Sequence, residues 1–121
     1  MKTYRGYRNG YTVSVQVIDG LRMKSLDPRF DLRRHSPDGF QWGYGGSGPA
    51  QLALALCADV WGNDVVAQVI YQRFKFRWVS CQVADLWTAT EEELLAIMRP
   101  LVEQERDRII ARMEAEQDDL S

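Results

Sequence analysis

The sequence is poor in the residues that build metal sites and disulfide frameworks. Its 121 residues contain two cysteines, Cys57 and Cys81, and a single histidine, His35. A structural zinc site needs four closely spaced Cys or His ligands, so we expect neither a metal nor a cofactor. Because cytosolic proteins rarely keep a disulfide, we expect two buried, reduced thiols, with a disulfide as the less favoured alternative.

Long apolar runs are also lacking. The longest mainly apolar run, Pro49–Val60, has 12 residues, which is too few to span a bilayer. Met1–Arg5 leads into mixed polar sequence without the apolar stretch of a signal peptide. We therefore expect a cytoplasmic protein with no membrane partner.

The net charge of −2 conceals a split along the chain. Residues 1–90 hold 11 Lys or Arg and 7 Asp or Glu, a net +4, whereas residues 91–121 hold 4 Arg and 10 Asp or Glu, a net −6. With 45% hydrophobic and 26% charged residues, the chain is typical of one globular domain. Its acidity argues against general coating of nucleic acid but permits a local basic site for an anion.

The first 25 residues predict an antiparallel β-meander. Valines alternate with polar residues over Tyr11–Ile18, which is typical of a half-buried strand. Asn9-Gly10 and Asp19-Gly20 are hairpin signals at its two ends, and the first is expected to form a type I′ turn. A third strand follows over Leu21–Ser25, and Phe40–Trp42 is a candidate fourth strand.

A segment rich in glycine and proline separates the meander from a central helix. Its composition predicts a long loop over residues 27–48. The helix is predicted to begin at Pro49, with Ser47 or Gly48 as N-cap, and to end at Gly62. Because it is apolar nearly all round, it should be the buried helix on which the sheet packs, in an α+β fold.

Two further helices complete the prediction. One begins at residue 63 or 64 and continues to about Lys75, although the alternation in Arg73–Trp78 would also suit a strand. The other follows a capping box of Thr90 and Glu93 and extends over 91–116, where Pro100 is expected to kink or split it.

The last helix divides the chain into a globular domain, 1–90, and an acidic helical extension, 91–121. A narrow apolar seam lies along the extension. It favours packing either on the domain or on a second chain, as a homo-oligomer. The seam consists of Leu94, Met98, Val102, Ile109 and Met113.

Gly43–Ala50 is the first candidate for a binding site. A glycine-rich loop that leads into a helix presents backbone N–H groups and the positive end of the helix dipole to an anion. Nearby arginines could grip phosphate oxygens, and rings, Phe76 among them, could stack on a ligand. The predicted ligand-binding residues are Arg33, Arg34, Trp42, Tyr44, Gly45, Gly46, Ser47, Gly48, Arg73 and Arg77.

Each part of this prediction has a structural alternative. The loop could be a tight turn that lets Trp42 and Tyr44 pack under the central helix. The rings of Arg73–Trp78 could be core, with its cations on the wet face. The loop is neither a Walker A motif nor a dinucleotide fingerprint, because the lysine and the glycine spacing are missing.

Catalytic constellations are lacking as well. Nucleophilic catalysis would need Ser47 or a cysteine with His35 as base, and Ser47 does not lie in a G-x-S-x-G motif. No two carboxylates are singled out by their spacing. We therefore expect no catalytic residues.

The segment Gly39–Leu56, together with Tyr4–Gly10 and Tyr71–Lys75, resembles an uncharacterised family of short bacterial proteins from phages, plasmids and other mobile elements. The resemblance extends from about Tyr4 to Trp87 and implies no established activity. It implies a setting among accessory genes, where small non-enzymatic proteins often counter host immunity, in the cytoplasm of a bacterial host.

We expect, on this basis, a non-enzymatic anti-defence protein that binds an anionic ligand such as a nucleotide immune signal. The first alternative is a direct inhibitor of a host defence protein, similar to an anti-CRISPR, in which the acidic extension could mimic nucleic acid. The second alternative is a small enzyme acting on a phosphate-bearing substrate.

Overall fold

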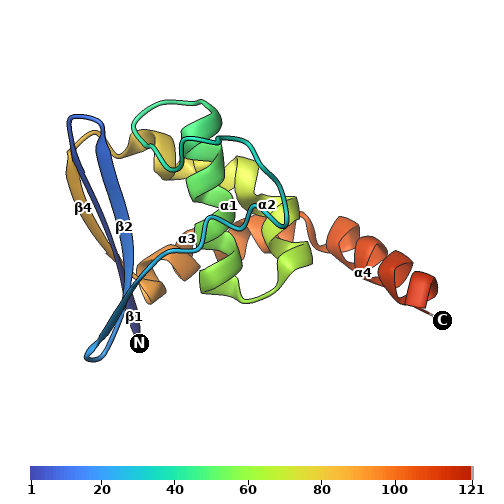
Figure 1. Cartoon of the computed structure of the whole chain (residues 1–121). Coiled ribbons are helices and arrows are strands. Elements are labelled where there is room, and N and C mark those ends of the chain that lie inside the picture. The colour runs from blue at the N-terminus through green and yellow to red at the C-terminus, as the bar shows by residue number, and fades with distance from the viewer. Residues whose placement is uncertain (121) are drawn as a thin grey trace.

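The structure, a computed structural model, describes residues 1–120 and, of these, the side chains of residues 1–118. It confirms an α+β fold in which the helices lie on one side of an antiparallel sheet (Figure 1). No helix within residues 1–120 has the length and apolarity needed to cross a membrane. The elements are β1 (Lys2–Asn9), β2 (Thr12–Asp19), β3 (Arg22–Ser25), α1 (Ser47–Trp61), α2 (Asp64–Arg77), a 3-10 turn η1 (Val79–Cys81), β4 (Leu86–Thr90), α3 (Glu91–Gln104) and α4 (Arg106–Leu120).

The three-stranded meander forms as predicted, but both of its turns lie one residue later. Asp19 pairs with Arg22, so Leu21 belongs to the second turn and not to the third strand. Asn9 pairs with Thr12, so Gly10 and Tyr11 are the central residues of the first turn. Gly10 has φ +62° and Tyr11 does not have a positive φ, which is the sign pattern of type II′. The type I′ prediction over Asn9-Gly10 is therefore wrong, because only the glycine adopts the left-handed backbone.

The fourth strand does not come from Phe40–Trp42, which is loop. It is β4, which follows α2 and pairs antiparallel with β1, from Thr3 opposite Thr90 to Tyr7 opposite Leu86. The sheet order is β3-β2-β1-β4. The side chain of Arg8 holds the Trp42 carbonyl at 2.9 Å, so the 40–42 segment meets the sheet through a side chain and does not extend the ladder.

Helix α1 is the buried central helix. It begins two residues before Pro49, with Gly46 as N-cap and no side-chain cap, so the predicted start was late. Pro49 is tolerated there because the first N–H groups of a helix have no intrahelical partner. Gly62, with φ +79°, ends the helix as predicted, and the Tyr4 hydroxyl ties β1 to α1 by donating to Asp59.

Three tryptophans fill the space between the sheet and the helices. The rings of Trp42 and Trp78 each meet the Trp87 ring edge to face, with centroids 5.7 and 5.0 Å apart. Trp87 in turn lies against Gly6 of β1, where an added Cβ would be 2.2 Å from the ring. The absence of a side chain at Gly6 is what admits the Trp87 ring.

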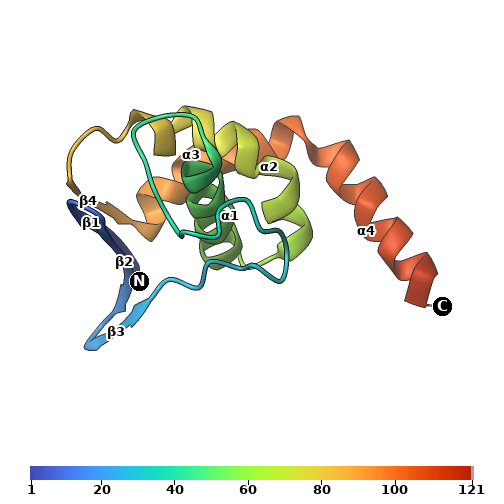
Figure 2. The same ribbon diagram turned by 45° about the horizontal axis from the view of Figure 1, so that its top comes forward.

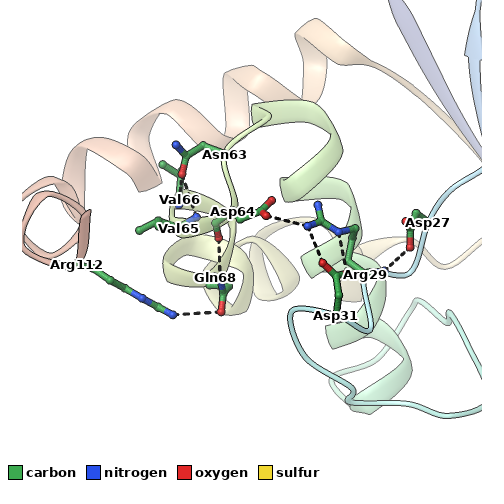
Figure 3. A network of polar contacts seen from close by, with 9 residues as sticks. All are labelled: Asp27, Arg29, Asp31, Asn63, Asp64, Val65, Val66, Gln68 and Arg112. Carbon is green, nitrogen blue, oxygen red and sulfur yellow. Dashed lines mark hydrogen bonds and ion pairs between the residues drawn. The ribbon is translucent and has the colours of Figure 1, made fainter. Parts of the chain in front are cut away.

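Helix α2 continues through Arg77, so Arg73–Arg77 is helical rather than extended, and Trp78 is the C-cap. Asn63 caps it by accepting hydrogen bonds from Val65 and Val66 at 3.0 and 3.1 Å, drawn in Figure 3. Phe74 is fully buried while Phe76 is 64% exposed, so the rings of this segment lie on different sides of the helix.

The C-terminal helix is split, but not at Pro100. The capping box of Thr90 and Glu93 starts α3 as predicted, and α3 passes through Pro100 to Gln104. The break comes at Glu105, with φ −105° and ψ 13°. The carbonyl that Pro100 leaves without a donor belongs to Ala96, which is exposed and can meet water.

The two halves of the split helix have different surroundings. Leu94, Met98 and Leu101 of α3 are buried against the body, as is Ile109 of α4. Beyond Met113, residues 114–118 are exposed, and α4 projects from the body (Figures 1 and 2). Side chains 119–121 of the acidic extension lie outside the described residues, and oligomerisation through this extension stays a prediction.

The two cysteines are both free, as expected, but only one is buried. Cys57 lies inside α1, and burial raises the pKa of its thiol well above the ordinary value. Cys81 is exposed at the end of η1, so the prediction of two buried thiols is wrong for this residue.

Candidate anion-binding site

The predicted ligand-binding residues do not gather in one place. The glycine-rich loop opens onto a hollow of about 440 Å³ beside the tip of the β1–β2 hairpin, whereas Arg33 and Arg73 line a second cleft of about 500 Å³. The two sets of lining residues share no member. The predicted site is therefore divided between two separate places on the molecule.

The hollow at the glycine-rich loop is poor in positive charge. Tyr44, Ser47 and Gly48 line it together with Tyr11 of the hairpin. Asp38 is the one acidic or basic residue among those that line it, and its negative carboxylate would repel an anion. Ser47 and Gly48 bring the start of α1 into this lining, but the lining contains no basic side chain.

The second cleft, which we call the arginine cleft, lies between the 33–35 segment, α2 and the α3–α4 junction. Four arginines and one glutamate in its lining give a net +3, in a chain whose net charge is −2. The lining residues are Arg33, His35, Gln68, Val69, Tyr71, Gln72, Arg73, Glu105, Arg108 and Arg112.

A buried glutamine of α1 positions one wall of this cleft. Gln51 is fully buried, and its amide NH₂ donates to the carbonyls of Pro28 and Arg33, at 2.6 and 3.0 Å. Its amide oxygen accepts a hydrogen bond of 2.7 Å from the His35 backbone N–H. Because these bonds satisfy a polar group in an apolar helix, the 33–35 segment is held at a fixed place on α1.

Ion pairs hold the same loop against the start of α2. Arg29, whose φ is +58°, donates to Asp31 at 3.0 and 3.1 Å and to Asp64 at 2.9 Å (Figure 3). Its guanidinium lowers the pKa of the Asp31 carboxyl. In the same view Arg112 of α4 donates to Gln68 of α2 at 3.2 Å, and both residues line the cleft.

Neighbouring residues position His35 and lower the pKa of its ring. His35 Nε2 lies 2.7 Å from the Tyr71 hydroxyl. Burial, followed by the charges of Arg33 and Lys75, lowers the pKa of His35 below its ordinary value of 6.5. An anion bound beside it would raise that pKa again, since opposite charge favours the protonated ring.

The remaining predicted residues lie outside the arginine cleft. Trp42 is fully buried, so its ring cannot stack on a ligand. Arg34 lies over the Phe30 ring at 5.1 Å, and Arg77 is exposed on the last turn of α2. Gly45 and Gly46 adjoin the exposed rings of Phe76 and Tyr44 rather than the arginines.

Sequence reasoning missed five residues that shape the cleft. Gln51 carried a signal, as a lone polar residue within an apolar helix. Tyr71, Glu105, Arg108 and Arg112 carried none, because ordinary polar faces of helices contain the same residues. Within residues 1–118, no group of three or more His, Cys, Asp or Glu side chains could hold a metal ion.

The chain belongs to a family of unknown function, DUF6166, whose model matches residues 4–100. This match covers the sheet, α1, α2 and most of α3, and it assigns no activity. Comparison with curated proteins and with solved structures finds no match.

Proposed function

We propose that this protein binds a phosphate-bearing anion in the arginine cleft and carries out no chemistry on it. In its more specific form, the proposal is that the ligand is a nucleotide that serves as an immune signal. By sequestering this signal, the protein would act as an anti-defence factor of a phage or another mobile element. The genomic part of the proposal rests on the family resemblance alone.

The observation that carries the proposal is the convergence of Arg33, Arg73, Arg108 and Arg112 on one cleft. They come from a loop, α2 and α4, so their meeting is a product of the tertiary fold. Guanidinium groups match the oxygens of phosphate in pairs, which suits recognition without catalysis. Only one carboxylate in the lining, Glu105, offsets their charge.

Native mass spectrometry of the protein purified from a bacterial lysate is the first test, because a retained nucleotide would identify the ligand. A panel of cyclic and linear nucleotides, with inorganic pyrophosphate, would then be titrated by calorimetry. Replacing Arg73 with Gln should weaken binding by about 10- to 100-fold, since hydrogen bonds to charged groups contribute about 1.5–3 kcal/mol.

Arg77→Gln is the matched control. It removes the same charge from the same helix, four residues away and outside the cleft lining. We expect it to bind within about threefold of the wild type, because exposed charges contribute little. Equal losses in both variants would refute the cleft. Loss of binding in Gly46→Trp but not in Arg73→Gln would move the site to the glycine-rich loop.

A second candidate function, direct inhibition of a defence protein, is favoured by the exposed end of α4. Ile110 is 41% exposed, and Glu114 and Glu116 lie with it along a groove of about 440 Å³. Removing residues 114–121 spares the buried Ile109 and should leave the fold intact. If inhibition of a purified effector survives that truncation, this candidate is excluded.

A further inference from the structure

A carboxylate already occupies the arginine cleft. Glu105 Oε1 lies 3.0 Å from Arg73 Nη2, and Glu105 Oε2 lies 3.5 Å from Arg108 Nη1. The Glu105 side chain is only 12% exposed, whereas the side chains of Arg73 and Arg108 are 53% and 68% exposed. Two accessible guanidinium groups thus converge on one sheltered carboxylate.

The backbone break between α3 and α4 explains this arrangement. Glu105 is the single residue between the two helices, and its neighbour Gln104 accepts a hydrogen bond of 2.8 Å from Arg73 Nη1. Both terminal nitrogens of Arg73 therefore point at the junction. These are the N–H groups that would grip a phosphate group in a bidentate manner.

We infer that Glu105 is an internal competitor for the anion, so that a ligand binds by displacing its carboxylate from Arg73 and Arg108. The inference rests on the proposed function of the same cleft. Carboxylate and phosphate oxygens satisfy the same donors, so the two anions exclude each other. Because the guanidinium groups of Arg73 and Arg108 are more than half exposed, solvent screens their attraction to the Glu105 carboxylate, so a phosphate group with a higher charge can displace it reversibly.

The test compares Glu105→Gln with Glu103→Gln, using inorganic pyrophosphate as the probe and calorimetry at fixed ionic strength. Glu103 is exposed on the last turn of α3 and does not line the cleft, so its replacement controls for the change in net charge. We expect Glu105→Gln to bind pyrophosphate about tenfold more tightly than the wild type, and Glu103→Gln to bind within about twofold of it, since salt screens distant charges.

The outcomes separate this inference from the proposed function. If the wild type binds and Arg73→Gln does not, but Glu105→Gln binds no more tightly, the cleft stands and the internal competitor is refuted. If even Glu105→Gln fails to bind pyrophosphate, both are refuted. Thermal unfolding checks that each variant is folded. Should Glu105→Gln not fold, Glu105→Asp, which withdraws the carboxylate by one methylene, must show an affinity above that of the wild type.

Discussion

Replacing Gly6 with alanine tests the tryptophan packing that joins the sheet to the helices. The new Cβ would lie 2.2 Å from Trp87 Cε2, 2.3 Å from Nε1 and 2.5 Å from Cζ2. To reach an ordinary contact of 3.4 Å, the ring would have to retreat by about 1.2 Å. Trp42 and Trp78 meet the same ring edge to face, so the retreat is blocked on those sides.

We expect Gly6→Ala to lower the free energy of unfolding by about 3 kcal/mol, the upper end of what overpacking costs in a well-packed core. For a chain of this length that loss corresponds to a fall in Tm of about 12 °C. Urea unfolding followed by tryptophan fluorescence measures the free energy directly, and the slope of the transition should be unchanged.

Gly45→Ala is the matched control, because its added Cβ would have only an ordinary contact, 3.6 Å from Phe76. It should change the unfolding free energy by less than about 1 kcal/mol. The double variant Gly6→Ala with Trp87→Leu should lose less unfolding free energy than the sum of the losses in the two single variants. The reason is that leucine is smaller than tryptophan and leaves room for the new Cβ. Wild-type stability of Gly6→Ala, or strict additivity in the double variant, would refute the packing.

Two further predictions concern titratable side chains. In the native protein a thiol reagent should modify Cys81 rapidly and Cys57 only on unfolding, because Cys57 is buried and the pKa of its thiol is raised. Mass spectrometry of the labelled peptides distinguishes the two cysteines. Equal labelling of both in the native protein would contradict the fold around α1. Anion affinity should rise as the pH falls from 7.5 towards about 5.5, because the free protein holds the pKa of His35 below 6.5 and a bound anion raises it, so that binding takes up a proton. His35→Gln should flatten this dependence in calorimetric titrations, and an unchanged profile in that variant would exclude His35 as its source.

Structural features that depend on interactions within a few residues could be predicted from the sequence. The alternation of Val13, Val15 and Val17 identified β2, and the capping box of Thr90 and Glu93 marked the start of α3. The start of α2 was placed at residue 63 or 64, and the helix begins at Asp64. The apolar surface of α1 identified the buried helix. These features depend on hydrogen bonds and burial patterns between near neighbours, so the local sequence specifies them.

Structural features that depend on residues far apart in the chain could not be predicted from the sequence. The edge of β1 accepts β4, about 80 residues further along the chain, rather than the nearer Phe40–Trp42. Such pairing is selected by the packing of Trp87 against Gly6, which no local pattern reveals. The break at Glu105 rather than Pro100 likewise involves a distant partner, because the first half of α4 contacts α2, where Arg112 donates to Gln68.

The candidate site illustrates the same division. The sequence by itself identified Arg33 and Arg73 as candidates and indicated an anion as the ligand class, because side-chain chemistry is a local property. Only the tertiary structure separated them from the glycine-rich loop and joined them to Arg108, Arg112 and the carboxylate of Glu105. Which charges share a cleft is decided by the packing of a loop, α2 and α4 around one another, and neighbouring residues in the chain do not encode that arrangement.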